Sequence, residues 1–177
     1  MIDLKIISHD YILDCLDVKE HNRQPIKNFD INILETIPFK YVPFIINSNF
    51  DESWDTKNLN ILPSATFADI YHETAHFVLM DGYHGYYDFG LGAGFASDST
   101  SLNKPKFDQV FCDDQENMAC LIEWTFMEYY GHSVNEIAWI MKHETYFDYS
   151  LDYYTETHSK IMKNKSKFQK YGINLVG

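Results

Sequence analysis

The segment between Pro63 and Gly82 constrains the fold most, because no glycine or proline interrupts it. An uninterrupted stretch of this length is typical of an α-helix of about four turns. Ser64 or Thr66 is suited to cap its N-terminus, since a hydroxyl there can accept a hydrogen bond from an otherwise unpaired backbone amide. We therefore expect a helix that begins near Thr66 and ends near Met80.

Inside this predicted helix, residues 72–76 read His-Glu-Thr-Ala-His. Residues four apart project from the same side of a helix, so His72 and His76 can bind one metal ion. Glu73 can reach a water on that ion without binding the ion itself. Zinc would lower the pKa of the water and polarise a carbonyl group, and the glutamate would act as general base and pass the proton to the leaving amine. The motif therefore predicts a Zn2+-dependent hydrolase that uses a zinc-activated water.

The same five residues can also occur without a metal, with both histidines hydrogen-bonded inside an aromatic core. The residues around the motif favour the metal, because most of them are apolar and indicate a buried helix. Two histidines and a glutamate are costly to bury unless they are paired. The apolar neighbours are Phe67, Ile70, Tyr71, Ala75, Phe77 and Val78.

A catalytic zinc keeps three protein ligands and one open position, so a third ligand is needed. The metzincin pattern H-E-x-x-H-x-x-G-x-x-H does not fit, because Leu79 and Gly82 stand where its glycine and third histidine should be. His84 follows two residues too late. Asp88 lies in a glycine-flanked stretch, as the aspzincin ligand does, but the other residues of that pattern are missing. His84 and Asp88 stay open as alternatives.

A second long helix is expected over residues 113–130, and it ends before Gly131. Glu116 begins an E-x-x-A pattern there, and an apolar run follows it. This pattern resembles the ligand helix of minimal gluzincins, including the anti-repressor (ImmA/IrrE-like) and ArdC-like metallopeptidases. The resemblance spans about residues 58–141, and it implies that Glu116 is the third zinc ligand.

Two other glutamates lie on the same predicted helix. Glu123 could replace Glu116 as the ligand, or it could orient a histidine through a hydrogen bond. Cys120 stands where larger gluzincins carry a further aspartate. Glu128 is expected to face solvent.

The glycine-rich stretch after the first helix is expected to fold over a substrate. We take Tyr83 and His84 as the candidates that stabilise the oxyanion, from a pool that also holds Tyr86 and Tyr87. These aromatic residues could instead pack on the protein surface.

The predicted substrate is a peptide or protein. The alternative function is a non-catalytic zincin-fold binding or scaffolding protein, with or without a structural zinc, in which His84 or Asp88 would be a fourth ligand.

The resemblance implies an α+β zincin fold in one domain over residues 1–177. A small, mostly N-terminal sheet would pack on the motif helix and on further C-terminal helices, and its edge strand could pair with an extended substrate. We expect strands over residues 39–48 and 58–64, the first at an edge because of Pro43. Further helices are expected over residues 135–143 and from residue 147 to near Gly172.

Composition narrows the possible partners and the location. The chain has 26 acidic and 14 basic side chains, a net charge of -12, which argues against nucleic acid and anionic membranes. No apolar run approaches the roughly 20 residues of a membrane span, and no secretory signal is visible, so we expect a cytoplasmic protein.

Cys15, Cys112 and Cys120 suggest buried, reduced thiols. Five lysines between Lys160 and Lys170 are expected to stay solvated. The sequence does not indicate an oligomeric state.

Overall fold

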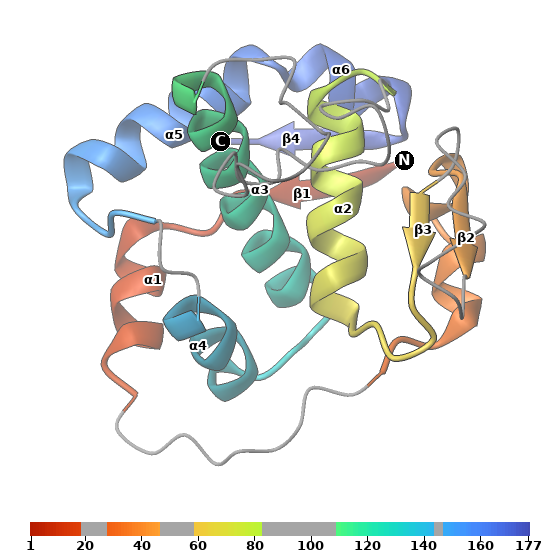
Figure 1. Cartoon of the computed structure of the whole chain (residues 1–177). Helices are drawn as coiled ribbons and strands as arrows, with labels where there is room; N and C mark the ends of the chain where they lie inside the picture. Colours follow the sequence, from red (N-terminus) through yellow and green to blue (C-terminus); the bar gives the residue numbers. More distant parts are fainter. Residues whose placement is uncertain (19–27, 47–58, 83–108, 144–146) are drawn as a thin grey trace.

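A computed structural model of the chain describes residues 1–18, 28–46, 59–82, 109–143 and 147–177 (Figure 1). Helices dominate this part of the chain, and the strands form two small sheets, so the predicted mixture of helices with a little sheet is confirmed. The elements in chain order are β1 (Ile2–Lys5), α1 (His9–Leu16), η1 (Ile31–Glu35), η2 (Phe39–Tyr41), β2 (Phe44–Ile46), β3 (Leu59–Ile61), α2 (Phe67–Leu79), α3 (Gln109–Tyr129), α4 (Val134–His143), α5 (Leu151–Lys163), α6 (Lys165–Lys170) and β4 (Ile173–Val176).

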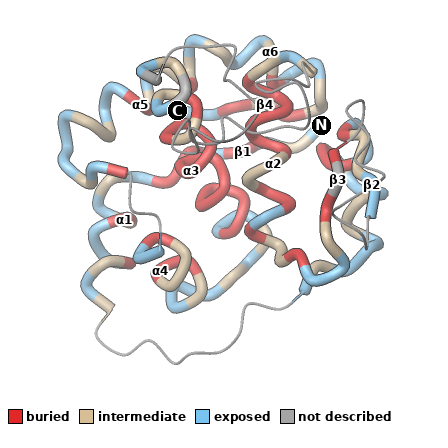
Figure 2. The backbone as a smooth tube through the Cα atoms, viewed as in Figure 1, coloured by how far each residue is buried: buried red, intermediate tan, exposed pale blue. Residues whose placement is uncertain are grey.

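Helix α3 lies at the centre of the core. Every residue from Asn117 to Met127 is buried, and Figure 2 shows this stretch as a continuous buried segment. A helix that is buried almost all round must be covered by several neighbours. Helix α2 lies alongside it, with α4 and α5 also packed against it. Helix α3 is therefore the central helix against which α2, α4 and α5 pack.

An aromatic cluster around Tyr71 of α2 joins this helix to η2 and α3. The ring centroid of Tyr71 lies 5.6 Å from Phe39, 5.7 Å from Phe126 and 5.5 Å from Tyr130. Its hydroxyl is also 3.1 Å from Nε2 of His132, which precedes α4. Aromatic pairs at these separations stabilise a core beyond the area that they bury. The cluster fixes α2 against α3.

The aromatic cluster also explains why one predicted strand is wrong in its first part. Residues 39–41 form the 3₁₀ helix η2 instead of extended chain, and this turn brings the fully buried Phe39 into the core. The strand β2 begins only after Pro43, and it pairs with β3 in parallel. The remaining residues of the predicted strand, 47 and 48, lie outside the described part.

Within the described ranges the strands form two separate pairs instead of the one small, mostly N-terminal sheet that was expected, although β1, β2 and β3 do lie in the N-terminal part of the chain. Strand β1 pairs in parallel with β4, so that Ile2 lies opposite Ile173 and Lys5 opposite Val176. Leu4 and Ile173 are fully buried, which explains why this short pair forms. Such pairing between the two ends of the chain leaves no local sequence pattern.

The helices follow the predictions more closely. Helices α2, α3 and α4 lie within four residues of the expected bounds at each end. The expected last helix is divided into α5 and α6 at Asn164, whose amide donates a hydrogen bond to the Lys160 carbonyl. Helix α1, capped by Ser8, was not predicted. None of the helices in the described ranges combines the length and apolar character that crossing a bilayer requires.

Candidate metal centre

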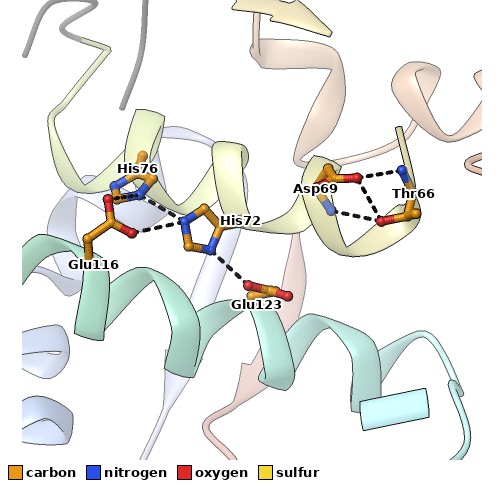
Figure 3. A network of polar contacts seen from close by, with 6 residues as sticks. All are labelled: Thr66, Asp69, His72, His76, Glu116 and Glu123. Atoms are coloured by element: carbon orange, nitrogen blue, oxygen red, sulfur yellow. Dashed lines mark hydrogen bonds and ion pairs between the residues drawn. The ribbon is translucent and has the colours of Figure 1, made fainter. Parts of the chain in front are cut away.

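The N-terminus of α2 is held by a reciprocal cap. Of the two candidate caps, Thr66 is the one used: its hydroxyl accepts from the backbone N–H of Asp69 at 3.4 Å. The Asp69 carboxylate accepts in return from the backbone N–H of Thr66 at 2.7 Å (Figure 3). An aspartate in the first turn also interacts favourably with the helix dipole. The cap fixes where α2 begins, and with it the direction of the motif side chains.

The C-terminus of α2 is held by α6. Lys167 donates from Nζ to the Leu79 carbonyl at 2.6 Å, and Lys170 forms an ion pair with Asp81 at 2.8 Å. Gly82 follows with a φ of 78°, a left-handed conformation that glycine adopts without strain. Positive charge here also complements the helix dipole. These two lysines are therefore not merely solvated, as the sequence suggested, because they support the helix that carries the motif.

Nitrogen and oxygen donors of three side chains converge between α2 and α3. Nε2 of His72 and Nε2 of His76 are 3.1 Å apart. Glu116 places Oε2 at 3.2 Å from the first and Oε1 at 3.3 Å from the second (Figure 3). Zinc bonds of about 2.0–2.1 Å in tetrahedral geometry put neighbouring donors roughly 3.3 Å apart. The separations of these donor atoms fit a single zinc ion.

The electrostatics of this donor set favour a cation. Burial alone would lower the pKa of His72, but hydrogen bonds with Cys120, Glu116 and Glu123 outweigh it and hold that pKa well above its usual value. Burial raises the pKa of Glu116, yet His76 and His72 outweigh it and hold the pKa well below its usual value. The cluster therefore stabilises positive charge at its centre, and a divalent cation can supply that charge in place of a proton.

Glu73 lies on α2 next to the donor set. Burial raises its pKa, and the nearby His76 and His72 oppose the shift. Its Oε2 atom is buried and accepts no hydrogen bond from any residue of the described ranges. An unpaired buried carboxylate oxygen is costly, which makes Glu73 a candidate functional residue. A raised pKa brings a carboxylate closer to the strength needed for a general base near neutral pH.

Glu123 contacts the other nitrogen of His72. Its Oε2 lies 2.8 Å from Nδ1, and its side chain is only 3% exposed. A carboxylate in this position accepts a hydrogen bond from Nδ1–H, which leaves the Nε2 lone pair directed at His76 and Glu116. Of the two roles considered for Glu123, the geometry favours orientation of His72, and it favours Glu116 as the ligand.

Cys120 also lies beside His72, a contact that the sequence analysis did not anticipate. Its thiol, with Glu123 and His72, forms a second group of donor atoms that all lie within 4.8 Å of one another. Glu116, Cys120 and Glu123 follow one another at spacings of four and three on α3, which places them on one side of the helix. That spacing is the signal from which the contact could have been found.

The structure describes some of the other candidate residues and not others. Glu128 is exposed, as expected. Tyr83, His84 and Asp88 lie outside the described residues, so their predicted roles are untested. Cys15 and Cys120 are buried thiols, in agreement with the sequence analysis.

Comparison of the chain with protein-family models, curated proteins and solved structures finds no match. The resemblance to gluzincins therefore depends on the motif residues and on their geometry alone.

Proposed function

We propose that this protein is a Zn2+-dependent metallopeptidase of the minimal gluzincin type that hydrolyses peptide bonds. The observation that carries the proposal is the convergence of His72, His76 and Glu116, with donor atoms 3.1–3.3 Å apart, beside Glu73, whose Oε2 atom is buried. A donor set of two histidines and one carboxylate is typical of catalytic zinc sites, which keep a position for water or substrate.

The two sides of the donor set differ in their access to solvent. The side chains of His72 and Glu116 are 19% and 15% exposed, whereas His76 is only 1% exposed. A substrate would therefore approach from the side of His72 and Glu116. The buried side holds the ligands in place, as a rigid site requires.

Zinc, when bound, supplies Lewis acidity that polarises a peptide carbonyl and makes water more acidic. The residues of the chain supply the remaining steps. Glu73 takes the proton of the attacking water and delivers it to the leaving amine, since its raised pKa suits both transfers. His72, His76 and Glu116 hold the ion, and Glu123 keeps His72 in the orientation that directs Nε2 at it.

The proposal is tested by zinc quantification and by cleavage of a mixed peptide library, on wild type and on three variants. We expect one tightly bound zinc in the wild type, together with cleavage. Glu116→Gln should lose most of the zinc, and Glu73→Gln should keep the zinc but lose cleavage. The matched control is Glu128→Gln, which changes an exposed glutamate on the same helix.

Each result that contradicts these expectations would change a different part of the proposal. Equal zinc in wild type and Glu116→Gln would move the third ligand to another residue. Zinc without any cleavage by the wild type would favour the non-catalytic binding or scaffolding protein. Absence of bound metal in the wild type would overturn the peptidase and leave only the form of the binding or scaffolding protein that has no structural zinc.

A further inference from the structure

The two nitrogens of His72 face two different sets of donor atoms. Nε2 faces His76 and Glu116, the set assigned above to zinc. Nδ1 faces Glu123 at 2.8 Å. The Cys120 thiol, Glu123 and a ring nitrogen of His72 form a second group, in which the donor atoms all lie within 4.8 Å of one another. The nitrogens of an imidazole point in opposite directions, so ions at the two positions would not exclude each other.

We propose that Cys120, Glu123 and Nδ1 of His72 form a second site for a thiophilic divalent cation. A thiolate together with an imidazole and a carboxylate selects ions such as Zn2+, Co2+ or Cd2+ over Mg2+ and Ca2+. This second site goes beyond the proposed peptidase and does not require it.

The geometry needs only small movements. Bonds of about 2.3 Å to sulfur and 2.0–2.1 Å to nitrogen put the donors roughly 3.6 Å apart around a tetrahedral ion. All donor atoms of the group lie within 4.8 Å of one another, so none of these separations has to shorten by more than about an ångström. Cys120 and Glu123 lie three residues apart on α3, so rotation of these two side chains can bring both donors to the ion.

The charges also balance. A divalent cation in the second site would displace the thiol proton of Cys120 and the Nδ1 proton of His72 to solvent, so the buried group would gain no net charge. The second site is the drier of the two, with Cys120 4% and Glu123 2% exposed. Electrostatic attraction between the ion and its ligands is stronger in such surroundings.

Occupation of the second site would change the first. Glu123 would turn from the His72 N–H to the ion, and His72 would lose the hydrogen bond that orients it. An excess of zinc should therefore inhibit the proposed peptidase, while the zinc of the first site stays bound.

The test uses Co2+ as the probe, in the full chain carrying Cys15→Ser and Cys112→Ser so that Cys120 is the only thiol. Metal-free protein is equilibrated with increasing Co2+, and stoichiometry and the thiolate-to-cobalt charge-transfer absorption are recorded. We expect two Co2+ per chain and a charge-transfer band that grows with the second equivalent. Glu116→Gln in this background should keep the band, because the second site does not use Glu116.

Further substitution of Cys120 by serine should abolish the band and reduce the stoichiometry from two to one, and Glu123→Gln should weaken the second equivalent. The same titration on the wild-type protein measures the stoichiometry and the band even if one of the variants fails to fold. One Co2+ without a thiolate band would overturn the second site and leave the peptidase proposal intact. Two bound Co2+ without the thiolate-to-cobalt band would mean that the second ion binds away from Cys120, and this result would also overturn the second site. No bound Co2+ at all would overturn both proposals.

Discussion

Two consecutive residues of α2 lie in contrasting surroundings. Tyr71 is enclosed by the rings of Phe39, Phe126 and Tyr130, and its hydroxyl has a partner in His132. His72, the next residue, lies between the carboxylates of Glu116 and Glu123. In the aromatic cluster, Tyr71 has both packing partners and a hydrogen-bond partner. In the polar cluster, by contrast, negatively charged carboxylates surround the histidines.

This difference separates the source of stability from the source of function. Stacked, buried rings stabilise the folded chain. Buried carboxylates weaken it unless a cation or proton compensates them. We infer that the aromatic cluster keeps α2 and α3 together. The polar cluster, which consists of His72, His76, Glu73, Glu116 and Glu123, is suited to binding a cation. Substitutions in the two clusters should therefore affect different quantities.

The largest effect is expected in the polar cluster. Glu73→Gln should lower the rate of peptide hydrolysis by about 10²–10⁴-fold, the usual contribution of a general base. The free energy of unfolding should hold or rise, because a neutral amide replaces a buried carboxylate. Initial rates at saturating peptide, with zinc content measured in parallel, check this. A loss of zinc in this variant would contradict the assigned role.

In the aromatic cluster, Phe126→Ala should lower the free energy of unfolding by about 3–5 kcal/mol, because the ring is fully buried. Denaturant unfolding of the metal-free protein measures the change. Tyr129→Ala on the same helix is the control, since that side chain is 42% exposed and should cost much less. Equal losses in both variants would mean that the cluster does not anchor the helices.

Orientation of His72 should show in metal affinity rather than in folding. Glu123→Gln should weaken zinc binding about 10–100-fold, the usual effect of removing a carboxylate that orients a metal-bound histidine. Competition with a chromophoric chelator gives the affinity. Unchanged affinity beside an unchanged Glu128→Gln control would leave Glu123 without this role.

A smaller effect is expected at the start of α2. Thr66→Ala removes the side chain that accepts from Asp69 and should cost about 1 kcal/mol of unfolding free energy. Ser64→Ala, two residues earlier and exposed, should cost almost nothing. Thermal or denaturant unfolding of the two variants distinguishes them, and the reverse order would identify Ser64 as the cap.

The smallest effect is a pH dependence in the aromatic cluster. Burial lowers the pKa of His132 below 6.5, and Glu136 only partly opposes this. The unfolded chain therefore binds a proton more readily than the folded chain below about pH 6.5. The contribution of His132 to stability is complete above that pH, and it is lost as the pH falls through the lower folded-state value. In His132→Asn the free energy of unfolding should change less between pH 7 and pH 5 than in the wild type, by on the order of tenths of a kcal/mol. An identical pH profile in the two proteins would contradict this role of His132.

The motif helix and its donors could be predicted from the sequence because they depend on local spacing. The absence of helix breakers located α2, and the four-residue interval placed His72 and His76 together. The E-x-x-A pattern pointed to Glu116. The contact of Cys120 with His72 was missed because it depends on how α3 packs against α2. The support of Leu79 by Lys167 joins residues 88 apart in the chain, and no local pattern encodes it.

The same limit applies to the strands. Strand β3 could be found from its alternating pattern, but the turn at Phe39 follows from a tertiary contact with Tyr71. The pairing of β1 with β4 joins opposite ends of the chain. Such pairings depend on the buried area of the whole fold and not on the residues of either strand alone.

The parallel pair of β1 and β4 has a mechanical consequence. Force that pulls the start of β1 away from the end of β4 acts along both strands, and it loads their hydrogen bonds together in shear rather than one at a time. Helix α6 directly precedes β4 and holds the end of α2 through Lys167. Once the strands slip, tension would therefore reach the helix that carries the histidines, and stretching the chain from its ends should separate His72 and His76 from Glu116 before the helical core unravels.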